Sequence, residues 1–255
     1  MEKDEFSIMF DVEKSYWWFV GKQFLVKNIL RRCSLNSLKR SRILDVGSGT
    51  GTILKLLEDY GIAYGVEVST DAIKFLKRRD LNFVVRSDAS LSIPFKEEVF
   101  SVITCLDVLE HIDDDVTLLN EMVRVCEPGG HIILTVPAFN ALWSQHDSAL
   151  QHRRRYTRKQ MLKRVSRLNS TVIKSSYYNT ALFLPILVVR KLKPLLSGRR
   201  NTASDFFVPI PRWLNALLTL LYVTEMACLQ FLNFPFGVSI LLILKKSNGY
   251  SVDRR

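Results

Sequence analysis

The sequence predicts an α/β fold in which a doubly wound, mainly parallel sheet is covered by helices. Two observations lead to this prediction. Short apolar runs of strand length alternate with helix-like stretches over residues 43–136. A glycine-rich turn at residues 47–51 joins the first apolar run to a helix, as in sheets whose parallel strands are linked through helices. The length of 255 residues suits one sizeable domain, or one domain with a large elaboration.

The individual elements follow from apolar patterning and from the signals that end helices. An aromatic-headed amphipathic helix is expected over residues 16–30. The expected strands are residues 43–46, 64–68, 83–86, 99–106, 131–136, 171–178 and 239–244. The other expected helices are residues 53–60, 70–79 and 113–125, and one within 151–167. Gly61 is expected to stop the first of these, while Ser69 and Thr157 offer N-terminal caps.

Composition and charge limit the class of partner and the compartment. The net charge of +11 favours anionic partners, namely nucleic acid, an anionic membrane surface or an acidic substrate; diffuse surface charge is the alternative. The cysteines are Cys33, Cys105, Cys126 and Cys228. Since none of them form a CxxC pair, we expect neither a disulfide framework nor a zinc site, which fits a reducing cytoplasm. Residues 1–5 are charged and precede no apolar run, so no signal peptide is expected.

The glycine-rich turn contains Gly47, Gly49 and Gly51 and lies between an apolar run and a helix. Such a turn brings backbone N–H groups and a helix N-terminus close to a ligand. Glu67 lies near the end of the next apolar run, where a carboxylate can accept hydrogen bonds from both hydroxyls of a ribose. The turn and the acid together predict a nucleoside cofactor.

Three further segments identify the cofactor through a family resemblance. Ser-Asp-Ala at residues 87–89 follows the third expected strand, Leu-Asp-Val-Leu-Glu-His at 106–111 follows the fourth, and Glu-Pro-Gly-Gly at 127–130 precedes the fifth. With these segments, residues 40–137 resemble the class I S-adenosylmethionine-dependent methyltransferases, and in particular their ubiquinone- and biotin-pathway branch. The resemblance implies a seven-stranded, Rossmann-like methyltransferase fold. It also implies S-adenosylmethionine as methyl donor and S-adenosylhomocysteine as product.

The resemblance also assigns residues to the cofactor. Glu67 is expected to bind the ribose and Asp88 the adenine amino group, while Leu106 lies near the methyl donor. Lys22 stands in an aromatic-Gly-basic element, where the family places a basic residue for the cofactor's carboxylate. The cofactor-binding residues expected in this way are Lys22, Asp45, Gly47, Ser48, Gly49, Gly51, Glu67, Val68, Asp88, Ala89 and Leu106. Turn stabilisation is the alternative role of Asp45, and a solvated loop acid is the alternative for Glu67 and Asp88.

Histidines are the candidates for general-base catalysis, which helps a weak nucleophile such as a hydroxyl attack the methyl group. His146 and His152 follow the fifth strand, on the rim where substrates enter such sheets, and Asp147 can fix a tautomer. His111 is a further catalytic candidate, although in the family this histidine more often shapes the pocket. A metal site made of His146, Asp147 and His152 is set aside, and no metal is expected.

The basic segment at residues 152–156 supplies the candidates for acceptor binding. It resembles an HxRRY element of a bacterial methyltransferase subgroup that shares the aromatic N-terminal element of residues 16–19. Arg154 or Arg155 is expected to hold an anionic group of the substrate, because an arginine binds carboxylate or phosphate through two parallel hydrogen bonds. Tyr156 and Trp18 are also assigned to substrate binding. A solvated basic helix start is the alternative for the basic segment, and core or lid packing is the alternative for Trp18.

Two apolar stretches, residues 182–189 and 214–234, interrupt the chain between the sixth and seventh strands. The expected organisation is an N-terminal helical cap or lid at 1–40, a methyltransferase core at 41–178 and 236–248, and a helical apolar insertion at 179–235. The insertion is expected either to cap the substrate pocket or to dock on an anionic membrane. Completion of the core or a dimer interface is the alternative, and a membrane span is not favoured.

The function predicted from these features is transfer of a methyl group from S-adenosylmethionine to oxygen or carbon of a small-molecule or lipid-linked acceptor. The expected protein is a cytoplasmic monomer or homodimer that can associate with the inner face of the membrane. An RNA methyltransferase is the first alternative, motivated by the charge. No RNA-binding module and no amine-methylating Asn-Pro-Pro-Tyr motif supports it, so a nucleic-acid partner is not favoured. The second alternative is a non-catalytic partner protein that binds the cofactor.

Overall fold

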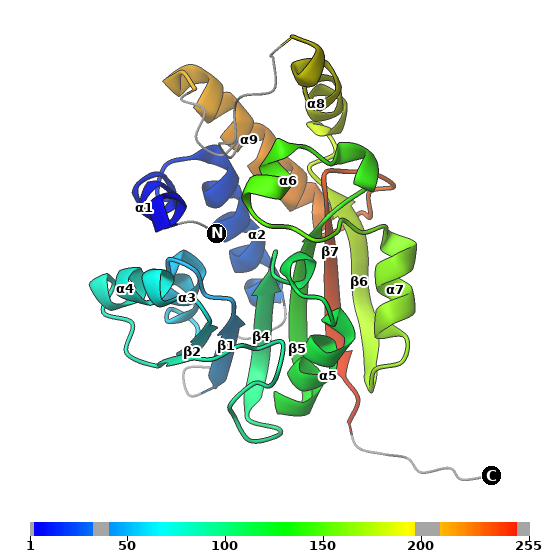
Figure 1. Ribbon diagram of the computed structural model, residues 1–255. Helices are drawn as coiled ribbons and strands as arrows, with labels where there is room; N and C mark the ends of the chain where they lie inside the picture. Colours follow the sequence, from blue (N-terminus) through cyan, green and yellow to red (C-terminus); the bar gives the residue numbers. More distant parts are fainter. Residues whose placement is uncertain (1–2, 33–40, 197–209, 249–255) are drawn as a thin grey trace, which may run out of the picture.

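The computed structural model describes residues 3–32, 41–196 and 210–248, and they build a seven-stranded sheet with the strand order β3-β2-β1-β4-β5-β7-β6 (Figure 1). The strands are β1 Arg42–Val46, β2 Ile62–Glu67, β3 Val84–Arg86, β4 Phe100–Leu106, β5 Cys126–Pro137, β6 Ser170–Tyr178 and β7 Ser239–Lys246. Strands β1 to β5 pair in parallel, and β7 runs antiparallel to both β5 and β6. The predicted mainly parallel sheet is therefore confirmed.

Helices cover both faces of the sheet because alternate strand residues point in opposite directions. Ile43 of β1 belongs to an apolar cluster with helices α2, α3 and α9, whereas its neighbour Leu44 belongs to one with α5 and α7. The helices are α1 Lys3–Val12, α2 Trp17–Arg32, α3 Thr52–Leu57, α4 Thr70–Arg78, α5 Asp115–Val125, α6 Gln145–Ala149, α7 Arg158–Val165, α8 Phe183–Leu196 and α9 Arg212–Leu229. Short 3₁₀ turns occupy Leu109–His111 (η2) and Asn140–Leu142 (η3).

Most of the predicted helix ends are present. Ser69 caps α4 by accepting a hydrogen bond from the Ala72 N–H, and Thr157 caps α7 in a capping box with Gln160. Helix α3 ends at Leu57, before the predicted stop at Gly61. Helices α1 and α6 were not predicted from the sequence. Both lie with α8 and α9 at the end of the sheet where the parallel strands finish (Figure 1).

The connection from β6 to β7 contains helices α8 and α9, as the apolar stretches predicted. Pro185 lies in the first turn of α8, where a missing N–H costs no helical hydrogen bond. Within the described parts of the chain, no helix combines the length and apolarity needed to cross a membrane. Part of the predicted insertion, residues 197–209, lies outside the described residues, as does Cys33.

Helices α2 and α9 approach closely at Gly21, which faces the ring of the fully buried Tyr222. A Cβ atom at Gly21 would lie 2.4 Å from Tyr222 Cδ1. The same helix contact places Trp17 and Trp18, whose rings both pack against that of Tyr222. Glycine at this position is therefore a packing requirement, and it fixes the aromatic N-terminal element against α9.

The substitution Gly21→Ala is expected to destabilise the protein by about 1–3 kcal/mol, because overpacking a helix contact outweighs the gain of up to about 1 kcal/mol in helix propensity. Urea unfolding measures the difference. In a Tyr222→Ala background the clash is absent, so there Gly21→Ala is expected to be neutral or stabilising. Equal destabilisation in both backgrounds would contradict the packing argument.

Candidate functional site

A cavity of about 1630 Å³ lies at the carboxyl ends of the parallel strands. The segments that surround it lie side by side in the order of the strands across the sheet. They are residues 87–91 at the end of β3, 67–69 at the end of β2, 45–50 at the end of β1 and 106–114 at the end of β4. Residues 146–155, which follow β5, close the row. We call the part formed by residues 45–50 and 67–69 the glycine-loop end, and the part formed by His111, His146 and His152 the histidine end.

The glycine loop and Glu67 form one hydrogen-bonded unit. Gly47, Gly49 and Gly51 have φ angles of 75°, 54° and 91°, in the left-handed region that favours glycine. A Cβ atom at Gly47 would lie 2.4 Å from Val108, so the loop also needs glycine for its approach to the segment after β4. The Gly49 N–H donates to one Glu67 carboxylate oxygen at 2.7 Å, and the Ser69 N–H donates to the other at 2.8 Å.

Asp45 anchors the start of the same loop from inside the protein. Its carboxylate accepts a hydrogen bond from the Thr104 hydroxyl at 2.6 Å, and its main-chain oxygen accepts one from the Ser48 hydroxyl at 3.0 Å. Burial raises the pKa of Asp45 to about 7; the Thr104 hydrogen bond opposes this shift and the nearby charge of Glu67 adds to it. The Asp45 carboxyl is therefore partly protonated near neutral pH.

This raised pKa makes stability depend on pH. Between the unfolded value of about 3.8 and the folded value of about 7, the folded state binds more protons than the unfolded state, so stability falls as pH rises. Relative to Asp45→Asn, which has no carboxyl to ionise, the wild type is expected to lose about 2–3 kcal/mol between pH 5 and pH 8. Urea unfolding at both pH values checks this, with Asp71→Asn on the surface of α4 as control. Parallel profiles of wild type and Asp45→Asn would refute it.

Lys22 and Asp107 form an ion pair on the cavity wall. The Lys22 ammonium lies 5.5 Å from the centre of the Trp18 ring, which also lines the cavity. Asp107 has a φ angle of 56°, and its second oxygen accepts a hydrogen bond from Thr135 at 2.8 Å. Burial raises the pKa of Asp107, but Lys22 and Thr135 together bring it below the ordinary value. Lys22 thus has an anionic partner within the protein, which sequence reasoning did not assign.

His152 is oriented by a buried carboxylate at the histidine end. Its Nδ1 lies 2.9 Å from Asp147, which also accepts hydrogen bonds from Arg155 Nε at 2.7 Å and from the Ser144 N–H at 2.9 Å. Burial opposes the charge of Asp147, but the hydrogen bonds from His152 and Arg155 hold its pKa well below the ordinary range. Since this carboxylate accepts, Nδ1 carries the proton and Nε2 keeps a free lone pair. That lone pair can take a proton or bind a cation.

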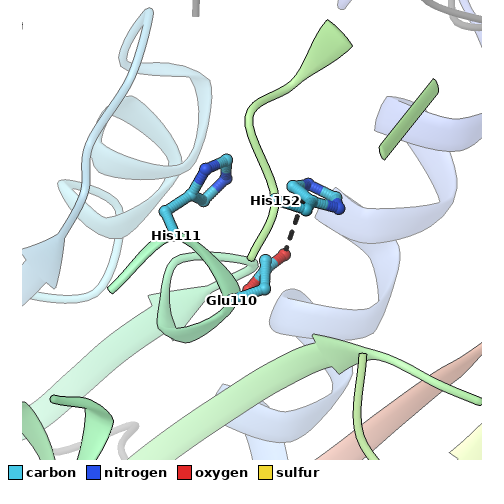
Figure 2. A group of neighbouring side chains, drawn as sticks. All are labelled: Glu110, His111 and His152. Carbon is cyan, nitrogen blue, oxygen red and sulfur yellow. Dashed lines mark ion pairs between the residues drawn. The ribbon is translucent and has the colours of Figure 1, made fainter. Parts of the chain in front are cut away.

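Glu110 and His111 lie beside His152 (Figure 2). His152 Nε2 is 3.8 Å from a Glu110 carboxylate oxygen, and the His111 and His152 rings meet edge to face with centres 4.8 Å apart. Burial, and the neighbouring charge of Asp107, raise the pKa of Glu110 well above its ordinary value. Burial, and the neighbouring His152, lower the pKa of His111 to about 4. His111 is therefore a neutral imidazole at neutral pH.

The residues Arg154, Arg155 and Tyr156, which were predicted to bind substrate, differ in their burial and in their hydrogen-bond partners. Arg155 is buried, holds Asp147 and donates to the Ala138 carbonyl at 3.0 Å, so it positions His152 although part of it reaches the cavity wall. Tyr156 is wholly buried, and its hydroxyl donates to Asp115 at 2.8 Å. Tyr156 is absent from the cavity lining, so its predicted contact with substrate is unsupported. Arg154 donates to the Asp113 carbonyl and is absent from the cavity lining, so its predicted role is also unsupported.

The remaining predicted residues mostly lie at the cavity. Its lining includes Lys22, Asp45, Gly47, Ser48, Gly49, Glu67, Val68, Asp88, Ala89, Leu106, His111, His146 and His152. Gly51 supports the loop from behind, where a Cβ atom would meet Leu76 and Leu81 at 2.7 Å. No role was predicted for Arg153, which lines the cavity, donates to the His111 carbonyl at 2.8 Å and pairs with Asp113. Arg153 lies beside Arg154 and Arg155 in the same basic segment, and this position is the sequence feature that could have identified it.

Comparison with known proteins shows what the segment that carries this site is similar to. Residues 44–134, from β1 to β5, match the family described as "Methyltransferase domain". Their glycine loop, Glu67 and the 106–111 segment are the parts of the site that the resemblance predicted. The matched range stops before His146 and His152, so the family match describes the glycine-loop end and only part of the histidine end.

Individual relatives agree with the domain and differ in what they act on. The chain is 30% identical over 38% of its length to norajmaline N-methyltransferase from Rauvolfia serpentina, and 23% identical over 49% to a ubiquinone biosynthesis O-methyltransferase from Aliivibrio fischeri. It spans 36% and 59% of their lengths. A SAM-dependent methyltransferase from Archaeoglobus fulgidus shares the fold with a TM-score of 0.54 and 22% identity, over 88% of this chain and 94% of that one.

Proposed function

We propose that the protein transfers a methyl group from S-adenosylmethionine to oxygen or carbon of a small or lipid-like acceptor. The observation that carries this proposal is the continuity of the cavity. One space of about 1630 Å³ joins the glycine loop and Glu67 to His152 and to apolar side chains of α8 and α9. Ligand pockets commonly enclose about 300–1,000 Å³, so this cavity has room for a cofactor and an acceptor together.

The glycine-loop end fits S-adenosylmethionine on features of its own. Glu67 is buried and ionisable, and each of its oxygens accepts one backbone hydrogen bond, which leaves a lone pair on each for the ribose hydroxyls. The positive φ angle of Gly49 brings the backbone to the cavity wall without a side chain. Asp88 is exposed beside the cavity and is assigned to the adenine amino group, and the Ala89 N–H is assigned as a donor to the adenine ring.

The histidine end supplies the means to activate an acceptor. S-adenosylmethionine carries its methyl group on a sulfonium, which an acceptor atom displaces in line, so the protein contributes mainly alignment of the two reactants. His152 contributes the Nε2 lone pair at the cavity, and Asp147 keeps the imidazole in the tautomer that leaves this lone pair free. We assign to His152 the activation of the acceptor's nucleophilic oxygen.

The walls contributed by the insertion favour an acceptor with an apolar part. The cavity-lining residues of this wall are Leu182, Pro185, Ile186, Val189, Leu214 and Leu218. On the outside of the same helices, Leu184, Trp213 and Leu220 are more than half exposed, and Arg212 is exposed beside them. An apolar surface next to a cation suits an anionic membrane surface, from which a lipid-like acceptor would enter.

Incubation with S-adenosylmethionine labelled in its methyl group, together with a fractionated cell extract, tests the proposal. Label is expected in the organic-soluble or small-molecule fraction. Label in the nucleic-acid fraction would favour the RNA methyltransferase alternative instead. Binding of S-adenosylhomocysteine without label transfer to any fraction would overturn the enzymatic assignment and favour a non-catalytic cofactor-binding protein.

A further inference from the structure

The group formed by Glu110, His111 and His152 has the composition of a metal site (Figure 2). We propose that these three side chains bind a divalent transition-metal cation, with Zn²⁺ as the preferred ion. The inference rests on the proposed function, because the ion would lie at the histidine end of the cavity, where the acceptor's nucleophilic oxygen is expected. The residues come from two segments far apart in sequence, which meet only in the folded chain.

The distances between the candidate ligand atoms are somewhat longer than those in an occupied zinc site. One ligand atom from each residue lies within 4.8 Å of the others, and His152 Nε2 and the Glu110 carboxylate oxygen are already 3.8 Å apart. Zn–N and Zn–O bonds of about 2.0–2.1 Å place tetrahedral ligands about 3.4 Å from each other. To complete a tetrahedral ligand set, the ligand atoms have to draw together from separations of up to 4.8 Å to about 3.4 Å.

The Glu110 carboxylate provides an independent argument. It is fully buried, and neither of its oxygens has a hydrogen-bond partner among the described residues. Two other buried carboxylates at or beside the cavity differ: Glu67 accepts hydrogen bonds from two backbone N–H groups, and Asp147 accepts them from His152, Arg155 and a backbone N–H. Burying a carboxylate without a partner is costly. A cation held between Glu110 and the two imidazoles supplies the missing partner.

The surrounding residues support the ligands as outer-shell groups do in metal sites. His152 donates its other ring N–H to Asp147, which is the carboxylate–histidine arrangement that orients metal-binding imidazoles. Arg153 holds the main chain of His111 through the hydrogen bond to its carbonyl. Among the described residues, the nearby cations Arg155 and Lys22 form their ion pairs with Asp147 and Asp107 rather than with Glu110.

Two imidazoles and one carboxylate are the protein ligands of open zinc sites, in which a fourth position takes water or substrate. The choice of imidazole over an all-oxygen set favours Zn²⁺ over Mg²⁺ or Ca²⁺. A cation held by Glu110, His111 and His152 would supply Lewis-acid chemistry, by which an acceptor hydroxyl would lose its proton to solvent more readily. The new C–O bond then forms as the C–S bond of the sulfonium breaks, giving the methyl ether, S-adenosylhomocysteine and the released proton.

Titration of the metal-free full chain with Zn²⁺ tests the site, and isothermal calorimetry measures the affinity. We expect about one ion per chain, and a fall in affinity of at least about tenfold in Glu110→Gln and in His111→Gln. The matched control is His131→Gln, a half-buried histidine on β5 outside the cluster, which is expected to bind Zn²⁺ as the wild type does. Absorption bands of Co²⁺ bound in place of Zn²⁺ report the nitrogen and oxygen ligands.

The outcomes separate this inference from the proposed function. Absence of stoichiometric Zn²⁺ binding, or binding that Glu110→Gln and His111→Gln leave unchanged, overturns the site; the second result would point to thiols such as the exposed Cys228. Methyl transfer that survives complete removal of metal overturns the role of the ion in catalysis while the proposed function stands. Conversely, Zn²⁺ binding that depends on Glu110 without any label transfer supports the site and contradicts the proposed function.

Discussion

Replacing His152 by glutamine is expected to lower methyl-transfer turnover by about 10²–10⁴-fold, the usual contribution of a group that activates the nucleophile. The physical reason is the loss of the Nε2 lone pair at the histidine end, which Asp147 orients in the wild type. Affinity for S-adenosylhomocysteine is expected to stay within about twofold, because the cofactor is bound at the other end of the cavity. Turnover is measured with labelled donor and the extract fraction that accepts label, and affinity by calorimetry.

The control for this substitution is again His131→Gln, which removes a histidine from β5 without touching the cavity lining. Thermal unfolding of both variants shows whether the fold is retained. Wild-type turnover in a folded His152→Gln variant would exclude His152 from the chemistry. A drop in turnover that merely follows a drop in cofactor affinity would make His152 a binding residue instead.

The parts of the site that were predicted from sequence depend on short stretches of chain. Gly47 and Gly49 are local signals, since a strand, a turn with positive φ angles and a helix follow one another within a few residues. Glu67 could be predicted because parallel strands finish at the same edge, so the end of β2 must lie beside the glycine loop. The bounds of the first four strands agree with the prediction to within about two residues, whereas β5 begins at Cys126, before the predicted start at residue 131.

The part that was not predicted depends on contacts between distant segments. Sequence patterning placed Arg154, Arg155 and Tyr156 in one basic run, but could not show which side chains point inward. The run lies beside β5, where an isolated bridge pairs Tyr156 with Ala138 and buries both Arg155 and Tyr156. Neither residue type is usually found fully buried, so their local properties pointed to the surface.

Glu110 illustrates the same limit for a single acid. In the sequence, Glu110 belongs to the 106–111 segment that carries the family resemblance, and nothing in that segment distinguishes it from any other acidic residue. Its carboxylate oxygens have no hydrogen-bond partner among the described residues, and this can be recognised only when the surrounding residues are known. The metal site considered from sequence included Asp147, but in the fold this carboxylate accepts hydrogen bonds from Arg155 and His152.

Helix α1 could have been predicted from the sequence, since Phe6, Met9 and Phe10 have the apolar spacing of a helix.

Replacing Glu67 by alanine is expected to weaken S-adenosylhomocysteine binding by at least about 10–100-fold, the loss associated with one or two hydrogen bonds to a charged group. The carboxylate acts twice in this argument. It offers lone pairs to the ribose, and it holds the Gly49 and Ser69 N–H groups in the orientation that shapes the loop. Removing it therefore costs direct contacts and also loosens the backbone against which the cofactor is bound.

A second variant separates these two roles. Glu67→Gln keeps the size of the side chain and one acceptor oxygen, so part of the loop's hydrogen bonding survives while the charge is lost. Its affinity is expected to lie between those of the wild type and Glu67→Ala. Asp71→Asn removes an acid of the same charge from the surface of α4, where it pairs with Lys74, and is expected to bind as the wild type does. Unchanged binding in Glu67→Ala would show that the cofactor does not use the end of β2. The glycine loop would then be only a structural turn between β1 and α3.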